Sequence, residues 1–156
     1  MASDRFISTP EGNDAEHVNL DDIKVLVVDD SKTILRSAEL YLKEKGCEVR
    51  TVEDGFQSLS IIDDYQPDII FLDIMMPRLD GYQTCAMIKS NEEYADIPVI
   101  MLSSKHNLFD KARGRLSGSE EYLTKPFSHD DLISAINTHT HTQTDDAEKL
   151  PEEFLF

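Results

Sequence analysis

The sequence contains no tryptophan and few cysteines, glycines or prolines: two, six and six among 156 residues. Cys47 and Cys85 stand far apart, and neither belongs to a C-x-x-C pair. A disulfide framework or a cysteine-built zinc site is therefore not expected. The expected state is two reduced, half-buried thiols.

Long apolar runs are also missing. No stretch approaches the ~20 apolar residues that a membrane-spanning helix needs. The first 17 residues lack the apolar centre of a signal peptide. We therefore expect a cytoplasmic protein without a membrane span.

Basic residues are scarce, with 15 Lys and Arg against 31 Asp and Glu and a net charge of −16. This excess is unfavourable for binding nucleic acid or anionic membranes, because both attract basic surfaces. Residues 1–22 carry six acids and one base, and residues 140–156 carry five acids and one base. Both segments are polar and aperiodic, which predicts a disordered acidic arm and tail around one folded domain over 23–139.

Within 23–139, short apolar runs alternate with amphipathic stretches. Strands are expected at 23–28, 47–52, 69–73, 97–102 and 121–124. Helices are expected at about 31–45, 55–65, 81–91, 106–117 and 129–138. Five β–α units in order predict a parallel sheet with helices on both faces, because crossover connections are right-handed. At this length a three-layer, doubly wound α/β fold is expected.

Polar side chains follow the predicted strands where each strand ends. They are Asp29 and Asp30, Asp73, Ser103, and Lys125. The carboxyl ends of parallel strands meet at one edge of a sheet, so these side chains should converge. Three neighbouring carboxylates repel one another, and a divalent cation would keep them ionised. Oxygen-only donors at an open edge favour Mg²⁺.

This group of residues suits phosphoryl transfer. An aspartate carboxylate can act as a nucleophile toward phosphorus. A metal ion, an ammonium group and a hydroxyl group can stabilise the oxygens of the transferring group. Asp73 is the expected nucleophile because it ends the central strand, whereas Asp29 and Asp30 are placed to hold the metal.

The segments VVDDS, FLDIMMPRLDG, MLSS and YLTKPF resemble the receiver domain of two-component response regulators, the CheY-like fold. The resemblance covers about 23–139. It implies a doubly wound five-stranded parallel sheet in the order 2-1-3-4-5 with five helices.

The same resemblance implies residue roles. Asp73 would accept a phosphoryl group from a histidine kinase. The carboxylates of Asp30 and Asp73 would bind Mg²⁺ directly, the backbone carbonyl of Met75 would be the third protein ligand, and Asp29 would help through water. Ser103 and Lys125 would contact the phosphoryl group, and Tyr122 would be the aromatic residue that turns inward on activation. The bond between Lys125 and Pro126 would be cis.

Three further segments, PRLDGYQTC (77–85), LSSK (102–105) and LFDKARGR (108–115), resemble the stand-alone receivers of type IV pilus chemosensory systems, which govern twitching motility. This implies a histidine kinase of a chemosensory array as one partner. The other is an output protein bound by the fourth helix, fifth strand and fifth helix. A basic cluster is expected there: Lys105, Lys111, Arg113 and Arg115. With only 17 residues after 139, we expect no output domain and no enzyme.

Three other interpretations stay open. An aspartyl-phosphate phosphohydrolase usually carries a second Asp two residues after the nucleophile, where this chain has Met75. A flavodoxin-like flavin protein needs an uncharged loop after the first strand, where this chain has Asp29 and Asp30. An inactive receiver would serve as a scaffold, although every acceptor-site residue is present. A phosphorylatable switch is therefore the favoured interpretation.

Overall fold

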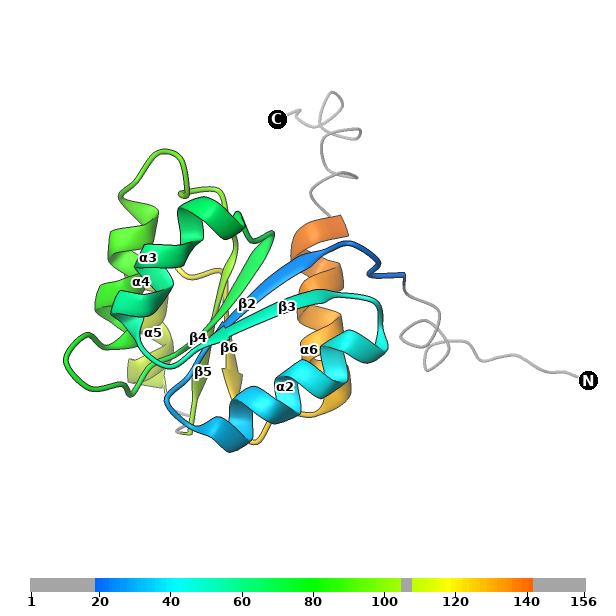
Figure 1. The fold of residues 1–156 in the computed structure, drawn as a ribbon. Coiled ribbons are helices and arrows are strands. Elements are labelled where there is room, and N and C mark those ends of the chain that lie inside the picture. Colours follow the sequence, from blue (N-terminus) through cyan, green and yellow to red (C-terminus); the bar gives the residue numbers. More distant parts are fainter. Residues whose placement is uncertain (1–18, 105–107, 142–156) are drawn as a thin grey trace, which may run out of the picture.

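The computed structural model of the protein describes residues 19–104 and 108–141. Within them, five strands alternate with five helices (Figure 1). The strands are β2 (Lys24–Val28), β3 (Glu48–Val52), β4 (Ile69–Asp73), β5 (Val99–Ser103) and β6 (Glu121–Thr124). The helices are α2 (Lys32–Glu44), α3 (Gly55–Tyr65), α4 (Gly81–Lys89), α5 (Leu108–Leu116) and α6 (His129–Ile136), and a turn of π-helix (Asn137–His141) follows.

The strands form one parallel sheet in the order β3-β2-β4-β5-β6. This is the predicted order 2-1-3-4-5, and the predicted doubly wound α/β class is confirmed. Helices α2 and α6 cover one face of the sheet, and α3, α4 and α5 cover the other (Figure 1). The sheet register places Val27 beside Phe71, and Leu72 beside Met101.

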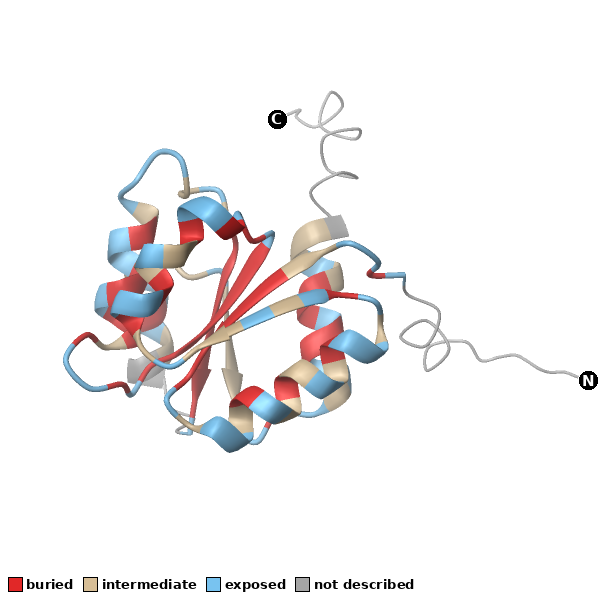
Figure 2. Cartoon of the chain, viewed as in Figure 1, coloured by how far each residue is buried: buried red, intermediate tan, exposed pale blue. Residues whose placement is uncertain are grey.

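Burial follows the position of each strand in the sheet. β4 and β5 are buried along their whole length, and β2 along all but its first residue (Figure 2). The two edge strands, β3 and β6, are only partly covered. The continuous apolar runs therefore marked strands with both faces covered, and the alternating run at 47–52 marked an edge strand, as predicted.

Local sequence signals fix several boundaries. The Ser31 side chain accepts a hydrogen bond from Ile34 N (3.4 Å) at the start of α2, and Gly46 follows the helix with φ +96°. β5 begins at Val99, two residues later than expected. Pro98 precedes it and has no N–H to donate to a neighbouring strand.

The folded domain begins before residue 23, the boundary that the sequence indicated. Leu20 is completely buried in the core beneath α2 and α6. The Ile23 N–H donates to Leu20 O (3.2 Å), which closes a turn at this point. A single leucine among acidic residues has no periodicity, so its burial gave no sequence signal. The rest of the predicted arm and tail, 1–18 and 142–156, lies outside the described residues.

Candidate metal and phosphoryl-acceptor site

Three aspartates meet at the carboxyl ends of the two central strands. Asp29 and Asp30 follow β2, and Asp73 is the last residue of β4. Carboxylate oxygens of all three lie within 4.8 Å of one another. Asp29 and Asp73 are 0% and 2% exposed, whereas Asp30 faces solvent. The strand order thus brings together the carboxylates that the sequence singled out.

Lys125 lies between the two buried carboxylates. Its Nζ atom donates to Asp29 Oδ2 and to Asp73 Oδ1, each at 3.0 Å. Asp29 is oriented from its other oxygen, because Oδ1 accepts the Ser31 N–H (2.9 Å). The backbone N–H of Lys125 donates to Ser103 O (2.6 Å), and the bond from Lys125 to Pro126 is cis. The loop after β6 therefore delivers one ammonium group to two carboxylates.

Burial and the contact between Asp73 and Lys125 act in opposite directions on the pKa values of both residues. Burial, the largest effect, and the negative charge of Asp29 raise the pKa of Asp73 to about 6, although Lys125 opposes the shift. Burial disfavours the ammonium form of Lys125, but its hydrogen bonds to Asp29 and Asp73 outweigh that effect and raise its pKa. Lys125 is therefore protonated at neutral pH. A further cation beside Asp73 would favour its carboxylate form.

The donor set fits a magnesium ion. The three aspartates offer only hard carboxylate oxygens, and exposed Asp30 leaves the site open on one side. Met75, whose carbonyl is the expected third protein ligand, lies two residues after Asp73 in the β4–α4 loop, and the residue is 64% exposed. The carbonyl ligand remains a prediction from the family resemblance.

The hydroxyl and aromatic candidates come from the two neighbouring strands. Ser103 ends β5 and is buried, one residue beyond Leu102, which pairs with Asp73. Tyr122 lies on β6 opposite Met101 and is half-buried. Ser103 therefore lies at the same end of the sheet as Asp73, and Tyr122 lies two strands away on β6.

The loop after Asp73 is held by a close approach of α4. A Cβ atom at Gly81 would overlap the backbone of Asp73 and Ile74, so only glycine fits there. The Gly81 N–H donates to Ile74 O (2.9 Å). Asp80 caps α4 by accepting from Gln83 N (2.8 Å), and Gln83 Oε1 accepts in return from Asp80 N (3.0 Å). The Asp80-Gly81 pair of the motif is therefore structural support for the acceptor loop.

Arg78 is a residue of this loop that sequence reasoning missed. Its guanidinium lies 3.0 Å from Asp54 Oδ2 and 5.3 Å from the centre of the Phe56 ring. Its φ of +69° is unusual for a residue with a side chain. These contacts tie the β4–α4 loop to the start of α3. The partners are more than 20 positions away, so no spacing rule could find them.

The expected basic cluster divides into two parts. The Arg113 guanidinium lies 4.2 Å from the centre of the Tyr82 ring, so it reaches across to α4. Lys111 and Arg115 instead line a hollow of about 290 Å³ together with Tyr122. Lys105 lies outside the described residues. Arg113 therefore points to α4 and does not line the hollow beside Tyr122 with the other two bases of the expected cluster.

Comparison with known proteins agrees with this geometry. Residues 25–137 match the family model of the response regulator receiver domain. The chain belongs to this family. It is also 60% identical over 124 residues to Protein PilG of Pseudomonas aeruginosa, covering 80% of this chain and 92% of that protein. The predicted resemblance is confirmed.

Solved structures of other receivers share the fold of this one. The chemotaxis protein CheY4 of Vibrio cholerae matches with a TM-score of 0.73 and 29% identity, covering 76% of this chain and 98% of that one. The Francisella response regulator 1452 receiver domain matches with a TM-score of 0.72 and 36% identity, covering 78% and 99%. In the described part of this receiver, no helix has the length and apolar character to cross a membrane.

Proposed function

We propose that this receiver is a phosphorylation-driven switch in which Asp73 accepts a phosphoryl group from a histidine kinase. The observation that carries the proposal is the bridge from Lys125 Nζ to the buried carboxylates of Asp29 and Asp73, 3.0 Å from each. The bridge lets the acceptor ionise in a buried position, which a nucleophile requires. Exposed Asp30 leaves one side of the site open for metal and phosphodonor.

The transfer uses residues already in position. An Asp73 oxygen attacks phosphorus, and the bond from phosphorus to the kinase imidazole nitrogen breaks. The imidazole nitrogen keeps the electron pair. Lys125 then donates to a phosphoryl oxygen, and the Ser103 hydroxyl donates to another.

In this proposal the carboxylates of Asp30 and Asp73 and the carbonyl oxygen of Met75 bind the magnesium ion, and Asp29 helps through water. Bound there, Mg²⁺ supplies electrostatic stabilisation of the negative charge on the transferring group. Both carboxylate oxygens of Asp29 already accept hydrogen bonds, from Ser31 N and Lys125 Nζ, which suits a role through water rather than as a direct ligand.

The output would be a change at the face formed by α5, β6 and α6. Ser103 drawn toward the phosphoryl group would leave space beside β6, into which Tyr122 turns. A partner that prefers this arrangement is then bound by population shift. Lys111 and Arg115 line the hollow beside Tyr122 together with Glu120 and Glu121, so a partner segment would meet charges of both signs there.

The similarity to Protein PilG supports a place in a type IV pilus chemosensory system. The kinase would then belong to a chemosensory array in the cytoplasm, and the output would control twitching motility. Met75, two residues after the acceptor, cannot donate a proton. This favours a lasting phosphoaspartate over the turnover of a phosphohydrolase.

The test is intact mass spectrometry after incubation with acetyl phosphate. With Mg²⁺, the wild type should gain the mass of one phosphoryl group, and Asp73→Asn should gain none. Asp130→Asn removes an exposed carboxylate on α6 and serves as the control that should still be modified. Equal modification of Asp73→Asn and wild type would contradict the proposal.

A further inference from the structure

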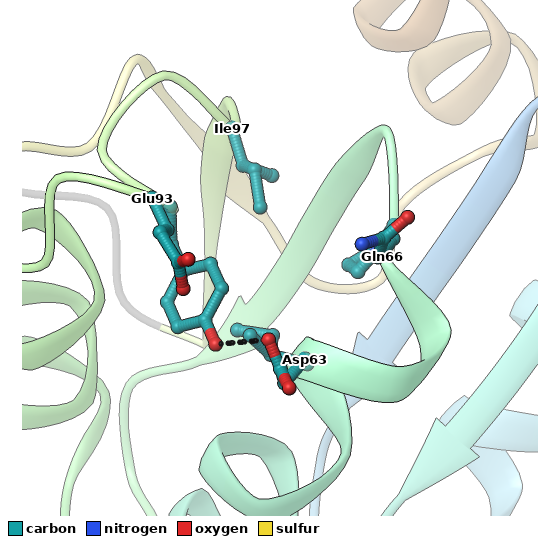
Figure 3. Close-up of a pocket in the computed structure, with 7 residues that line it drawn as sticks. Asp63, Gln66, Glu93 and Ile97 are labelled. Carbon is teal, nitrogen blue, oxygen red and sulfur yellow. Dashed lines mark hydrogen bonds between the residues drawn. The ribbon is translucent and has the colours of Figure 1, made fainter.

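A second hollow lies at the opposite edge of the sheet, between the end of α3 and the segment 91–97 that precedes β5 (Figure 3). Its volume is about 360 Å³. The apolar and aromatic residues that line it are Ile62, Pro67, Tyr94 and Ile97, and the polar ones are Asp63, Gln66 and Glu93. This mixture differs from the phosphoryl site, where buried carboxylates dominate.

The position of this hollow separates it from the phosphoryl site. Pro67 and Ile97 come just before β4 and β5, whereas Asp73 and Ser103 end those strands. Each strand has five residues, and a strand rises about 3.3 Å per residue. The two sites are therefore separated by the length of the sheet, roughly 15 Å.

The surface around the hollow is strongly acidic. The segments 61–68 and 91–97 contain no Lys or Arg. They carry six exposed acids: Asp63, Asp64, Asp68, Glu92, Glu93 and Asp96. In the described part of the chain, none of these carboxylates forms an ion pair. The α3 C-terminus adds a partial negative charge at the same place.

Two lysines approach this surface, and both are occupied by other groups. Lys24 Nζ donates to Tyr65 O (3.3 Å). Lys89 Nζ donates to Ala95 O (3.0 Å) and Ile97 O (2.6 Å), and it pairs with Glu120 (2.9 Å). Lys89 thus holds the backbone of the segment 91–97 in place, and its positive charge is paired with Glu120 rather than with the acids around the hollow.

The shape of the hollow suits a long cationic side chain. Ile62 and Pro67 are buried and form a rigid apolar surface. The Tyr94 hydroxyl donates to Asp63 Oδ1 (2.9 Å) and closes one side (Figure 3). An arginine has both parts that such a site matches, an aliphatic stem for the apolar wall and a planar cation for carboxylates.

We propose that this hollow docks a basic segment of a partner protein, with an arginine stem against Ile97 and Pro67 and its guanidinium at Asp63 and Glu93. A second copy of the chain is disfavoured because each copy carries a net charge of −16. The chain's own terminal segments are acidic as well. Because the walls lie away from Asp73, docking is insensitive to phosphorylation and independent of the function proposed above.

The test is an amide NMR titration of the ¹⁵N-labelled full chain with a blocked synthetic peptide of alternating arginine and leucine. The matched peptide has citrulline in place of arginine, which keeps the shape and removes the charge. Saturable shifts should appear in segments 62–67 and 93–97 with the arginine peptide only. They should persist when Asp73 carries beryllofluoride, a phosphoryl mimic.

Two charge variants distinguish specific binding of the peptide in the hollow from attraction of the peptide to the acidic protein as a whole. Asp63→Asn with Glu93→Gln should weaken peptide binding at least tenfold. Glu44→Gln with Asp130→Asn removes two exposed charges elsewhere and should leave it unchanged. Equal weakening by both variants, or shifts spread over all acidic surfaces, would overturn the proposal. So would concentration-dependent shifts in segments 62–67 and 93–97 without peptide, because a second copy would then be the occupant.

Discussion

The Nζ atom of Lys125 lies 3.0 Å from Asp73 Oδ1, a contact between residues 52 positions apart in the chain. It joins the loop after the edge strand β6 to the end of the central strand β4. The contact opposes the rise in the pKa of Asp73 that burial causes, and it places a donor where phosphoryl oxygens would form. Much of the chemistry proposed for this receiver depends on that relationship.

Without metal, ionised Asp73 should destabilise the fold. Its pKa of about 6 in the folded protein exceeds its ordinary value of 3.8, so the folded state binds more protons between these pH values. Stability from this group is therefore present below pH 4 and is lost as pH rises through 6, by up to roughly 3 kcal/mol. Asp73→Asn should raise the unfolding free energy at pH 8 by about 2 kcal/mol and change it little at pH 4.

Urea unfolding followed by circular dichroism, with a chelator present, measures this difference. The chain has no tryptophan, so fluorescence is a poor probe. Asp130→Asn is the exposed control and should show no comparable gain at pH 8. A wild type more stable than Asp73→Asn at pH 8 would contradict the pKa assignment.

Asp30→Ala should reduce Mg²⁺ affinity at least tenfold, because the site loses an exposed anionic ligand. The fold should be little affected, since the Asp30 side chain faces solvent. Isothermal titration calorimetry with MgCl₂ gives the affinity. Glu53→Gln removes another exposed acid, just after β3, and controls for the general field. Unchanged Mg²⁺ affinity in Asp30→Ala would remove it from the ligand set.

The phosphorylated form should lose its phosphoryl group slowly, with a half-life of minutes or longer. Hydrolysis needs a water held in line with Asp73, and Met75 beside that approach offers no acceptor for water. Met75→Glu should therefore accelerate the loss several-fold.

The measurement is the decay of phosphorylated mass after acetyl phosphate is removed. Leu40→Met, an exposed substitution on α2, is the control. A wild-type half-life of seconds would contradict the expectation.

The output face should depend on Lys111 and Arg115 rather than on Arg113. Lys111→Glu with Arg115→Glu removes both positive charges from the hollow beside Tyr122, where Glu120 and Glu121 remain. It should abolish twitching motility while phosphorylation continues normally. Arg113→Glu mainly disturbs the contact with Tyr82 and should have the smaller effect on partner binding. Normal motility in the double variant, with normal phosphorylation, would move the output surface elsewhere.

Most of the fold and the acceptor site could be predicted because strong, local patterns encode them. Continuous apolar runs marked β2, β4 and β5, and residues directly after them had to meet at one edge. Asp29 and Asp73 were found in this way, and Lys125 because it follows the short predicted strand at 121–124. Their positions follow from topology alone, without knowledge of any side-chain geometry.

Contacts that depend on side-chain direction were beyond the sequence. Arg113 faces Tyr82 because of its angular position around the axis of α5. A count of basic residues in the sequence does not reveal that position. His139 belongs to the segment next to the predicted tail, yet its Nε2 lies 2.7 Å from Glu121 Oε1. Leu20 was missed because a single buried residue produces no hydrophobic periodicity in the sequence.

Borohydride trapping tests the central claim most directly. Borohydride reduces an aspartyl phosphate to homoserine, so tandem mass spectrometry of the digested protein identifies the acceptor. After treatment with acetyl phosphate and Mg²⁺, homoserine should replace Asp73 and should be absent when Mg²⁺ is chelated. Homoserine at Asp29 or Asp30, or at no aspartate in a protein that has gained phosphoryl mass, would contradict the account.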